Sequence, residues 1–407
     1  MRLKDGYRSR ASEKRIVILK RSSLGIFLVS IIVVALGFTN CRTTHTPNEA
    51  IRIGAIAPFT GDGANYGKAA RTAIDLAVDE LNAGGGINGK KIEVLYEDDR
   101  GSPRDALSAF QKLTSVDKVP AVLGPFYSGN VLACAPEAER TQVVLLTGSA
   151  TSDNIRNAGD FTFRVCPSND TQSRTIANFA FSRLKLNSAF VLYRNVDYGV
   201  TLRDAFDKAY RSLGGEIVGV EAIPADATDV RAQLAKVKVT KPSFIFAAVH
   251  YTEGGALLRQ AKELGIGAVI IGTDGGYDPQ LLTIAGTAAE GSYWVTVGLG
   301  DEAVNPTVAT FKDAYFKRYG EEAGAYSALY YDATRVLARA IARASTVNGP
   351  SIQKALQAGD DYEGPTGITK FDSFGDVDKP FSIYQVKTGK FVPVSEIAKS
   401  KGAANDD

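Results

Sequence analysis

The sequence predicts an α/β fold built from two doubly wound, parallel-sheet lobes. Short apolar, β-branched runs alternate with helical stretches in two successive sets, the first from Ile51 and the second from Ser188. Such alternation produces parallel sheets covered by helices on both faces. The 407 residues suffice for about two or three domains. No linker rich in Pro, Ser or charge separates the sets, so we expect closely joined lobes.

The elements of both sets follow from apolar periodicity and from helix-start and helix-stop signals. In the first set, strands are expected at IRIGAIA, KIEVLYEDD, AVLGP, VVLLTGSA and FTFRV, and helices at 66–81, 103–116 and about 130–140. In the second set, strands are expected at AFVLYR, IVGVEAI, FIFAAV and AVIIGT, and helices at 200–213, 228–237 and 254–264. Three helices follow, at 306–319, 326–344 and 351–358, and FSIYQVKTGKFVPV predicts a hairpin around Thr388-Gly389.

Composition excludes several classes of function. Residues 1–40 hold eight Lys and Arg against two Asp and Glu, whereas the remainder holds 39 against 43. A mildly acidic body without a basic tract does not predict nucleic-acid binding. Two histidines, His45 and His250, and three cysteines exclude a four-cysteine zinc module and most histidine-centred metal sites. We expect neither a metal nor a cofactor.

The amino end predicts export. The apolar run 24–38 follows a basic stretch and is shorter than the about 20 residues of a membrane span, which is typical of a secretory signal. We expect a signal peptide at 1–40 and a tether at 41–50. Cys41 resembles the lipid-modified first residue of a bacterial lipoprotein, which would anchor the chain to the membrane, although 38–40 match the usual small residues poorly. Ordinary cleavage and an uncleaved anchor are the alternatives, and all three export the body.

Cys134 and Cys166 have two interpretations. Exported cysteines tend to pair, but a disulfide requires Cα atoms about 4.4–6.8 Å apart. Cys134 is predicted in the middle of a helix and Cys166 at the end of a strand. The alternatives are therefore a disulfide or two buried thiols.

The segments that follow the strands predict a small-molecule site, because ligands of doubly wound sheets bind beyond the carboxyl ends of the strands. These segments are rich in hydroxyls, aromatics and glycine and poor in Lys and Arg. They are 58–61, 124–128, 147–151, 195–199, 250–253 and 273–275. A cleft lined in this way suits a ligand held by hydrogen bonds.

Seven motifs carry a family resemblance over about Ile51 to Val394. They are IRIGAIAPFTGDGANYG, NAGGGINGKKIEVLYEDD, GPFYS, GSATS, FRVCPSND, NVDYG and GTDGGYD, in this order. The chain resembles the Leu/Ile/Val-binding proteins of branched-chain amino-acid ABC importers. The resemblance implies a type I periplasmic binding protein, a Venus-flytrap receptor with three crossovers between its lobes. It places lobe 1 at 51–167 with 298–364, lobe 2 at 168–297 with 365–395, and a tail at 396–407.

The same resemblance implies the ligand-binding residues. Ser128, next to Tyr127 in GPFYS, matches the position that takes the ligand carboxylate, and a helix amino end offers free N–H donors there. Ala150 and Thr151 match the stretch that contacts carboxylate and ammonium. Asp274 matches the acid that pairs with the ammonium. The aromatic ligand contacts are matched by Tyr66, Tyr198 and Tyr251.

The chain also departs from the family pattern, and each residue has a plainer alternative. It has Arg100 and Tyr127 near the places of a family cysteine pair, and Asp274 is one methylene shorter than the Glu of some relatives. Asp274 also suits a turn, Ser128 an N-cap, and the tyrosines simple packing. His250 is expected at the cleft rim or packed inside.

We expect an extracytoplasmic, monomeric substrate-binding protein of an ABC importer that delivers an amino acid, branched-chain or similar, to its permease. The alternatives are a receptor for an amide, urea or an aromatic acid, or the ligand-sensing subunit of a signalling system. An enzyme is not expected, because the sequence has no G-x-S-x-G elbow, no phosphate-binding loop and no G-x-G-x-x-G that follows a strand; the glycines at 84–86 end a predicted helix instead.

Overall fold

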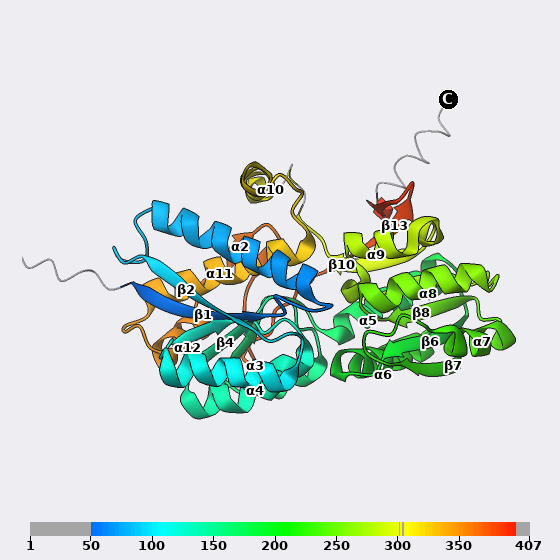
Figure 1. Cartoon of the computed structure of the whole chain (residues 1–407), viewed down its shortest axis with the longest axis horizontal. Helices are drawn as coiled ribbons and strands as arrows, with labels where there is room; N and C mark the ends of the chain where they lie inside the picture. Colours follow the sequence, from blue (N-terminus) through cyan, green and yellow to red (C-terminus); the bar gives the residue numbers. More distant parts are fainter. Residues whose placement is uncertain (1–49, 301, 303–304, 396–407) are drawn as a thin grey trace, which may run out of the picture. The chain divides into compact units, whose positions relative to one another are not determined.

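The computed structural model of the chain describes residues 50–300, 302 and 305–395. The expected signal peptide, Cys41, nearly all of the tether and the tail at 396–407 lie outside the described residues. The described body has the expected α/β fold with two lobes, each built around one main sheet (Figure 1). No helix in this part of the chain is both long enough and apolar enough to cross a bilayer.

Lobe 1 contains a five-stranded, all-parallel sheet in the order β2-β1-β3-β4-β5. Its strands are β1 (Ile51–Ala57), β2 (Ile92–Asp98), β3 (Ala121–Leu123), β4 (Val144–Thr147) and β5 (Thr162–Arg164). Its helices are α2 (Ala64–Ala83), α3 (Pro103–Gln111), α4 (Ser128–Thr141), α10 (Pro306–Tyr319), α11 (Ala325–Arg343) and α12 (Gly349–Gln357). Helices α2 and α11 lie on one face of the sheet, and α3 and α4 on the other (Figure 1).

Lobe 2 contains a seven-stranded sheet in the order β14-β13-β10-β9-β8-β6-β7. Its strands are β6 (Ser188–Arg194), β7 (Glu216–Ile223), β8 (Phe244–Ala248), β9 (Val269–Gly272), β10 (Tyr293–Val297), β13 (Phe381–Lys387) and β14 (Lys390–Pro393). Its helices are α5 (Asn169–Asn178), α6 (Asp197–Ser212), α7 (Arg231–Thr240), α8 (Tyr251–Glu263) and α9 (Pro279–Ala285). The expected hairpin turns at Thr388-Gly389, both with positive φ, as a two-residue turn requires.

Three segments cross between the lobes, after β5, after β10 and before β13. The third crossing is later than the sequence predicted. Residues 365–379, expected in lobe 2, contact lobe 1: Thr366 N donates to Asp332 of α11 at 3.0 Å, and Arg164 N donates to Gly375 O at 3.0 Å. The predicted crossing point is instead the turn of a small hairpin, β11 (Tyr362–Gly364) with β12 (Gly367–Thr369), which returns the chain to lobe 1.

The sequence missed two helices for physical reasons. Helix α5 has the sequence NDTQSRTIAN, with only Ile176 and Ala177 apolar, so it shows no apolar stripe. Helix α9 has seven residues, too few for a periodic pattern to appear. Most of the other expected helices begin or end within about three residues of their observed bounds, which is the usual precision at helix ends.

Cys134 and Cys166 do not form the possible disulfide and are both buried, free thiols. Cys134 is on the buried face of α4, whereas the Cys166 thiol points to Ala150 O at 3.4 Å. Burial raises the pKa of Cys166 to about 12 and also raises that of Cys134, so both remain protonated. The alternative of two buried thiols is the correct one.

Candidate functional site

A small cavity lies where the carboxyl ends of the two sheets meet. It has a volume of about 20 Å³, which is room for about one water molecule. Ten residues line it: Tyr66, Phe126, Tyr127, Ser128, Ser149, Tyr198, His250, Asp274, Gly275 and Tyr326. Most follow β3, β4, β6, β8 or β9, the place where doubly wound sheets bind ligands. An amino-acid-sized molecule can enter only when the lobes move apart.

The lobe 1 wall is formed by two loops that are bonded to each other. Gly124 ends β3 with φ +88°, and a Cβ there would collide with Ile56 O, so glycine is required for this close approach. The Ser149 hydroxyl donates to Phe126 O at 2.7 Å, and Ser128 Oγ accepts from Ser152 N at 3.2 Å. Ser128 is the first residue of α4, where N–H groups have no partner within the helix.

Asp274 is the acidic group of the cavity and begins a short 3₁₀ turn, Asp274–Gly276, after β9. Its carboxylate is 4% exposed and accepts from Tyr198 OH at 2.7 Å and from Gln172 Nε2 at 2.8 Å. Tyr326 OH lies 3.5 Å from its second oxygen. Burial raises the pKa of Asp274, and these hydrogen bonds partly oppose the rise. All three contacts are neutral groups, and no described Lys or Arg side chain forms an ion pair with it.

Aromatic rings form most of the remaining wall. Tyr66 stacks on Phe126 with ring centroids 4.7 Å apart and lies 4.8 Å from Tyr251 and 5.5 Å from Tyr326. His250 stacks on Tyr127 at 5.1 Å. Burial lowers the pKa of His250 well below 6.5, with Arg194 adding to the effect, so its imidazole is neutral at neutral pH. The cavity therefore combines one carboxylate with neutral, largely apolar surroundings.

Hydrogen bonds between the lobes surround this cavity. Asn65 Nδ2 donates to both carboxylate oxygens of Asp278, at 2.8 and 2.7 Å. The hydroxyl of Tyr66 donates to Gly275 O, and the hydroxyl of Tyr251 donates to Asp62 O. Each bond joins a residue of lobe 1 to a residue of lobe 2, so separation of the lobes must break them.

The structure brings most of the predicted site residues together. Tyr66, Tyr127, Ser128, Tyr198 and Asp274 line the cavity. Ala150, Thr151 and Tyr251 do not line it, but each borders it: the first two follow Ser149, and the Tyr251 ring contacts Tyr66. The Thr151 hydroxyl is buried without a hydrogen-bond partner. Ligand contact by these residues remains a prediction.

Sequence reasoning missed six residues of this site. Phe126, Ser149, His250 and Gly275 belong to the strand-end segments, which was the signal that could have selected them, and His250 is packed inside as expected. Tyr326 lies in the first turn of α11, and Gln172 in α5. Neither follows a strand, so only the folded chain shows that both reach Asp274.

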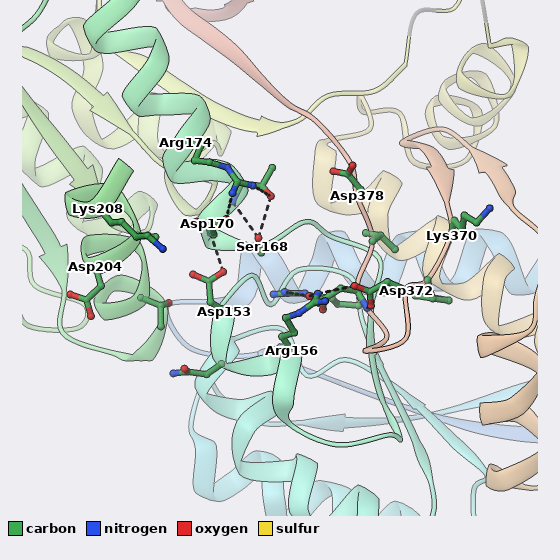
Figure 2. Close-up of a pocket in the computed structure, with 18 residues that line it drawn as sticks. Asp153, Arg156, Ser168, Asp170, Arg174, Asp204, Lys208, Lys370, Asp372 and Asp378 are labelled. Carbon is green, nitrogen blue, oxygen red and sulfur yellow. Dashed lines mark hydrogen bonds and ion pairs between the residues drawn. The ribbon is translucent and has the colours of Figure 1, made fainter. Parts of the chain in front are cut away.

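A larger cavity of about 940 Å³ lies beside the first and third crossings (Figure 2). Its charged side chains largely satisfy one another, for example Arg156 with Asp372 at 2.8 Å and Arg164 with Asp376 at 2.7 Å. Its lining comes mainly from α5, α6 and the third crossing, whereas ligands of doubly wound sheets bind beyond the carboxyl ends of the strands. We therefore place the candidate ligand site at the smaller cavity between the strand ends.

Two α/β lobes with a polar and aromatic cavity between their strand ends define a two-lobed binding protein for small molecules. The model of the periplasmic binding protein family matches residues 50–390, and the chain belongs to this family. The family resemblance that the motifs indicated is thus confirmed. Membership makes the chain an extracytoplasmic binding protein rather than an enzyme, as the sequence predicted.

Three similar proteins illustrate the relationship. The Leu/Ile/Val-binding protein BraC3 of Rhizobium johnstonii is 30% identical over 84% of this chain and 93% of its own length. The branched-chain amino acid transporter substrate-binding protein LivJ of Streptococcus pneumoniae, solved with isoleucine, is 32% identical with a TM-score of 0.79, covering 84% of this chain and 99% of its own. An ABC-transporter solute-binding protein of Rhodopseudomonas palustris, solved with 3,4-dihydroxybenzoic acid, is 26% identical with a TM-score of 0.75, covering 84% and 95%.

Proposed function

We propose that this chain is the substrate-binding protein of an ABC importer and binds an amino acid, branched-chain or similar, between its lobes. Asp274 carries the proposal. Its carboxylate is buried at the strand-end cavity and is bonded only to neutral groups among the described residues. An ionised group buried without a counter-charge costs several kcal/mol, about the penalty that a ligand ammonium would remove.

Lobe 1 offers groups for the ligand carboxylate opposite Asp274. Ser128 places a hydroxyl and the amino end of α4 at the cavity, and a helix amino end favours anions. Thr151, beside it, has a buried hydroxyl without a partner. We assign the carboxylate to Ser128, Ala150 and Thr151, and the ammonium to Asp274. The rings of Tyr66, Tyr127, Tyr198 and Tyr251 would contact the rest of the ligand.

Binding would proceed by closure of the lobes. The cavity of about 20 Å³ is too small for free entry, and hydrogen bonds such as Asn65–Asp278 join the lobes around it. A ligand that is contacted by both lobes favours the closed form, because its contacts are complete only there. The closed, loaded protein would then deliver the amino acid to the permease subunits.

The finer assignments come from the amino-terminal sequence and from the relatives. We infer that Cys41, directly after the apolar run, carries a lipid that anchors the exported protein to the membrane. We also infer that the protein acts as a monomer, since one chain supplies both lobes and the whole cavity. Mass spectrometry of the protein purified from membranes tests the lipid, and a globomycin-sensitive shift in mass is the expected result.

A receptor for an aromatic acid is the second candidate. It is supported by the aromatic wall and by the relative solved with 3,4-dihydroxybenzoic acid. An aromatic acid has no ammonium group, so it would leave Asp274 without a counter-charge. This observation favours the amino acid. A role as the ligand-sensing subunit of a signalling system would use the same site.

Calorimetry and thermal unfolding test the proposal on protein that has been unfolded and refolded to remove carried-over ligand. The panel holds the amino acids, urea, short amides, benzoate and 3,4-dihydroxybenzoate. At 100 times its Kd a ligand adds about 2.7 kcal/mol to the free energy of unfolding. We expect an aliphatic amino acid to bind, whereas the matching 2-keto acid, in which a carbonyl oxygen replaces the ammonium, does not. Binding of the keto acid or of benzoate with equal affinity would contradict the assigned role of Asp274.

A further inference from the structure

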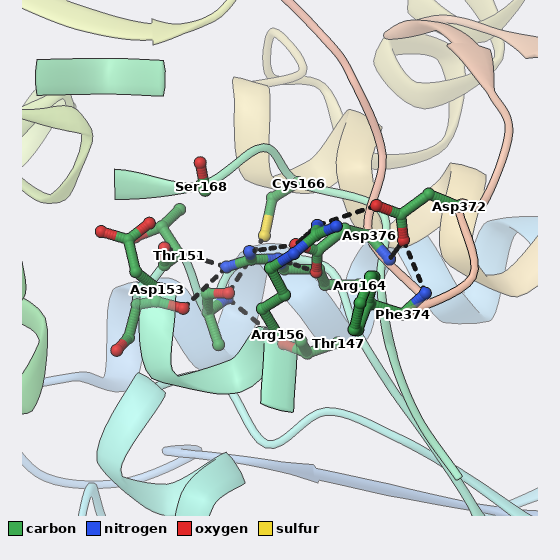
Figure 3. A network of polar contacts seen from close by, with 12 residues as sticks. Thr147, Thr151, Asp153, Arg156, Arg164, Cys166, Ser168, Asp372, Phe374 and Asp376 are labelled. Atoms are coloured by element: carbon green, nitrogen blue, oxygen red, sulfur yellow. Dashed lines mark hydrogen bonds and ion pairs between the residues drawn. The ribbon is translucent and has the colours of Figure 1, made fainter. Parts of the chain in front are cut away.

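A second buried polar cluster lies where the first and third crossings meet (Figure 3). Arg164, the last residue of β5, is 1% exposed. Its Nε and Nη2 donate to the two carboxylate oxygens of Asp376, each at 2.7 Å. Asp376 lies in the third crossing segment, so this fork ties that segment to the end of the lobe 1 sheet. Such bidentate, charge-assisted pairs fix both groups in one orientation.

The same guanidinium also holds the loop beside the ligand cavity. Arg164 Nη1 donates to Thr151 O at 3.0 Å and to Ser152 O at 2.8 Å. Thr151 O further accepts from Asn169 N, at the start of α5 in lobe 2, at 2.7 Å. One side chain therefore connects the loop, the third crossing and, through a shared carbonyl, the first helix of lobe 2.

This loop carries groups that face the ligand site. Ser149 lines the cavity, and Ser152 N donates to Ser128 Oγ, which also lines it. Thr151 Oγ1, between them, is buried without a partner. The backbone that carries this hydroxyl is held by Arg164 through the carbonyls of Thr151 and Ser152.

We propose that Arg164 is a positioning residue for ligand binding. Oriented by Asp376, it fixes the Ala150–Ser152 loop, which carries Thr151 and donates from Ser152 N to Ser128 Oγ, and so places Thr151 and Ser128 for the ligand carboxylate. The inference rests on the proposed function for the nature of the ligand. Arg164 itself lies outside the cavity lining and makes no contact there. Its action is indirect, and it makes the geometry of the binding loop depend on the third crossing.

The chemistry of this position requires arginine. The guanidinium of Arg164 donates four hydrogen bonds from its three nitrogen atoms. Two go to the Asp376 carboxylate and two to the adjacent carbonyls of Thr151 and Ser152. A lysine ammonium keeps the charge but lacks the rigid fork, so it cannot serve both partners at once. Arg156 is a natural comparison because it also bonds Asp376, at 3.0 Å, but its side chain is 42% exposed and, among the described residues, it makes no hydrogen bond to the loop.

The test compares Arg164→Lys with Arg156→Lys in the full chain. The first measurement is hydrogen–deuterium exchange of peptides covering 149–153, without added amino acid. We expect at least about tenfold faster exchange in Arg164→Lys and no change in Arg156→Lys. The second is the Kd for the amino acid that the wild type binds. We expect an affinity loss of about tenfold in Arg164→Lys, because two charge-assisted hydrogen bonds to the loop are weakened, and less than twofold in Arg156→Lys.

A third variant separates positioning from general stability. Phe206→Leu removes part of a fully buried ring that stacks on Phe246 in lobe 2 at 3.9 Å, far from the loop in the chain. We expect it to lower the melting temperature and leave the Kd unchanged. Asp376→Asn replaces Arg164→Lys if the latter does not fold, with Asp372→Asn as its control.

The outcomes distinguish the two proposals. If the wild type binds no member of the ligand panel, the proposed function fails, while the exchange measurement still decides the role of Arg164. If the wild type binds but Arg164→Lys exchanges and binds like wild type, the positioning role is overturned. Equal loss of affinity in Phe206→Leu and Arg164→Lys also overturns it, since a merely structural effect would then explain both.

Discussion

Two buried carboxylates of this protein have opposite surroundings. Asp376, at the third crossing, is 7% exposed and is bonded to two guanidinium groups, those of Arg164 and Arg156. Asp274, at the cavity between the strand ends, is 4% exposed and is bonded to two phenols and an amide. Burial is similar, so the difference lies in the counter-charge: the protein supplies it at the crossing and does not supply it at the cavity.

The comparison shows how a buried carboxylate that stabilises the fold differs from one that is available to bind a ligand. A buried carboxylate with its own cation stabilises a fixed arrangement of the chain, and removal of either partner leaves an uncompensated charge. Asp332 with Lys379 repeats this arrangement, 0% and 1% exposed and 3.9 Å apart, at the end of the third crossing. A buried carboxylate with neutral partners is ready for a cation from outside, and at Asp274 we propose that this is the ligand ammonium.

Removal of a cation at the crossing should have the largest effect. Arg164→Met leaves Asp376 with only the half-exposed Arg156, and we expect the free energy of unfolding to fall by about 3–5 kcal/mol. Urea denaturation measures it. Arg174→Met is the control, because Arg174 pairs with Asp170 at the surface, where its side chain is 58% exposed, and should cost about 1 kcal/mol or less. Equal losses in the two variants would contradict the structural role of the buried pair.

Neutralising Asp274 should weaken binding without lowering the stability of the unliganded protein. In Asp274→Asn we expect the affinity for the amino acid to fall by about 2–5 kcal/mol, measured by calorimetry. The unliganded variant should be no less stable than the wild type, because a carboxylate buried without a cation has been removed. Asp226→Asn serves as the matched control, since Asp226 is also in lobe 2 but its side chain is 45% exposed. Preserved binding in Asp274→Asn would remove the proposed distinction between the two carboxylates.

Loss of a bond between the lobes should have a smaller effect. Asn65→Ala removes both hydrogen bonds to Asp278 and leaves the Asp278 cap of α9 in place. We expect about 1 kcal/mol weaker binding, seen in stopped-flow traces as faster ligand release with little change in association. Asn178→Ala is the control, because among the described residues the Asn178 amide bonds only to Arg174 O within α5. An unchanged release rate would show that this bond does not hold the closed form.

The pH dependence should be the smallest and most diagnostic difference. Burial raises the pKa of Asp274 above 3.8, so the folded protein holds this proton to higher pH than the unfolded chain. The stability from this group is complete below 3.8 and is lost as pH rises through the raised pKa. The wild type should therefore lose stability relative to Asp274→Asn over this interval, while amino-acid binding strengthens because only the ionised carboxylate attracts an ammonium. Thermal melts of both proteins between pH 3 and 8 measure the difference, and parallel curves would contradict it.

Most of the fold could be predicted from the sequence because its elements have local signals. Apolar runs and helical spacing gave most strands and helices, although not β10, β11 or β12, and Thr388-Gly389 marked the hairpin. Helix α5 escaped because its buried face is largely polar, and the third crossing, which the family resemblance placed after 364, comes later because the β11–β12 hairpin returns the chain to lobe 1. At α5 and at the third crossing, contacts with residues distant in the sequence outweigh the local pattern.

The sequence alone determined the two-lobed α/β architecture and predicted the strand-end positions of the site, because both depend on local order along the chain, whereas the choice of Asp274 came from the family resemblance. Only the tertiary structure decided which partners these residues have. Gln172 and Tyr326 meet Asp274 across 102 and 52 positions of sequence, and Arg164 meets Asp376 across 212. Such contacts arise when two sheets and three crossings fold together, and they decide whether a buried charge is paired with a counter-charge of the protein or remains available to pair with a ligand.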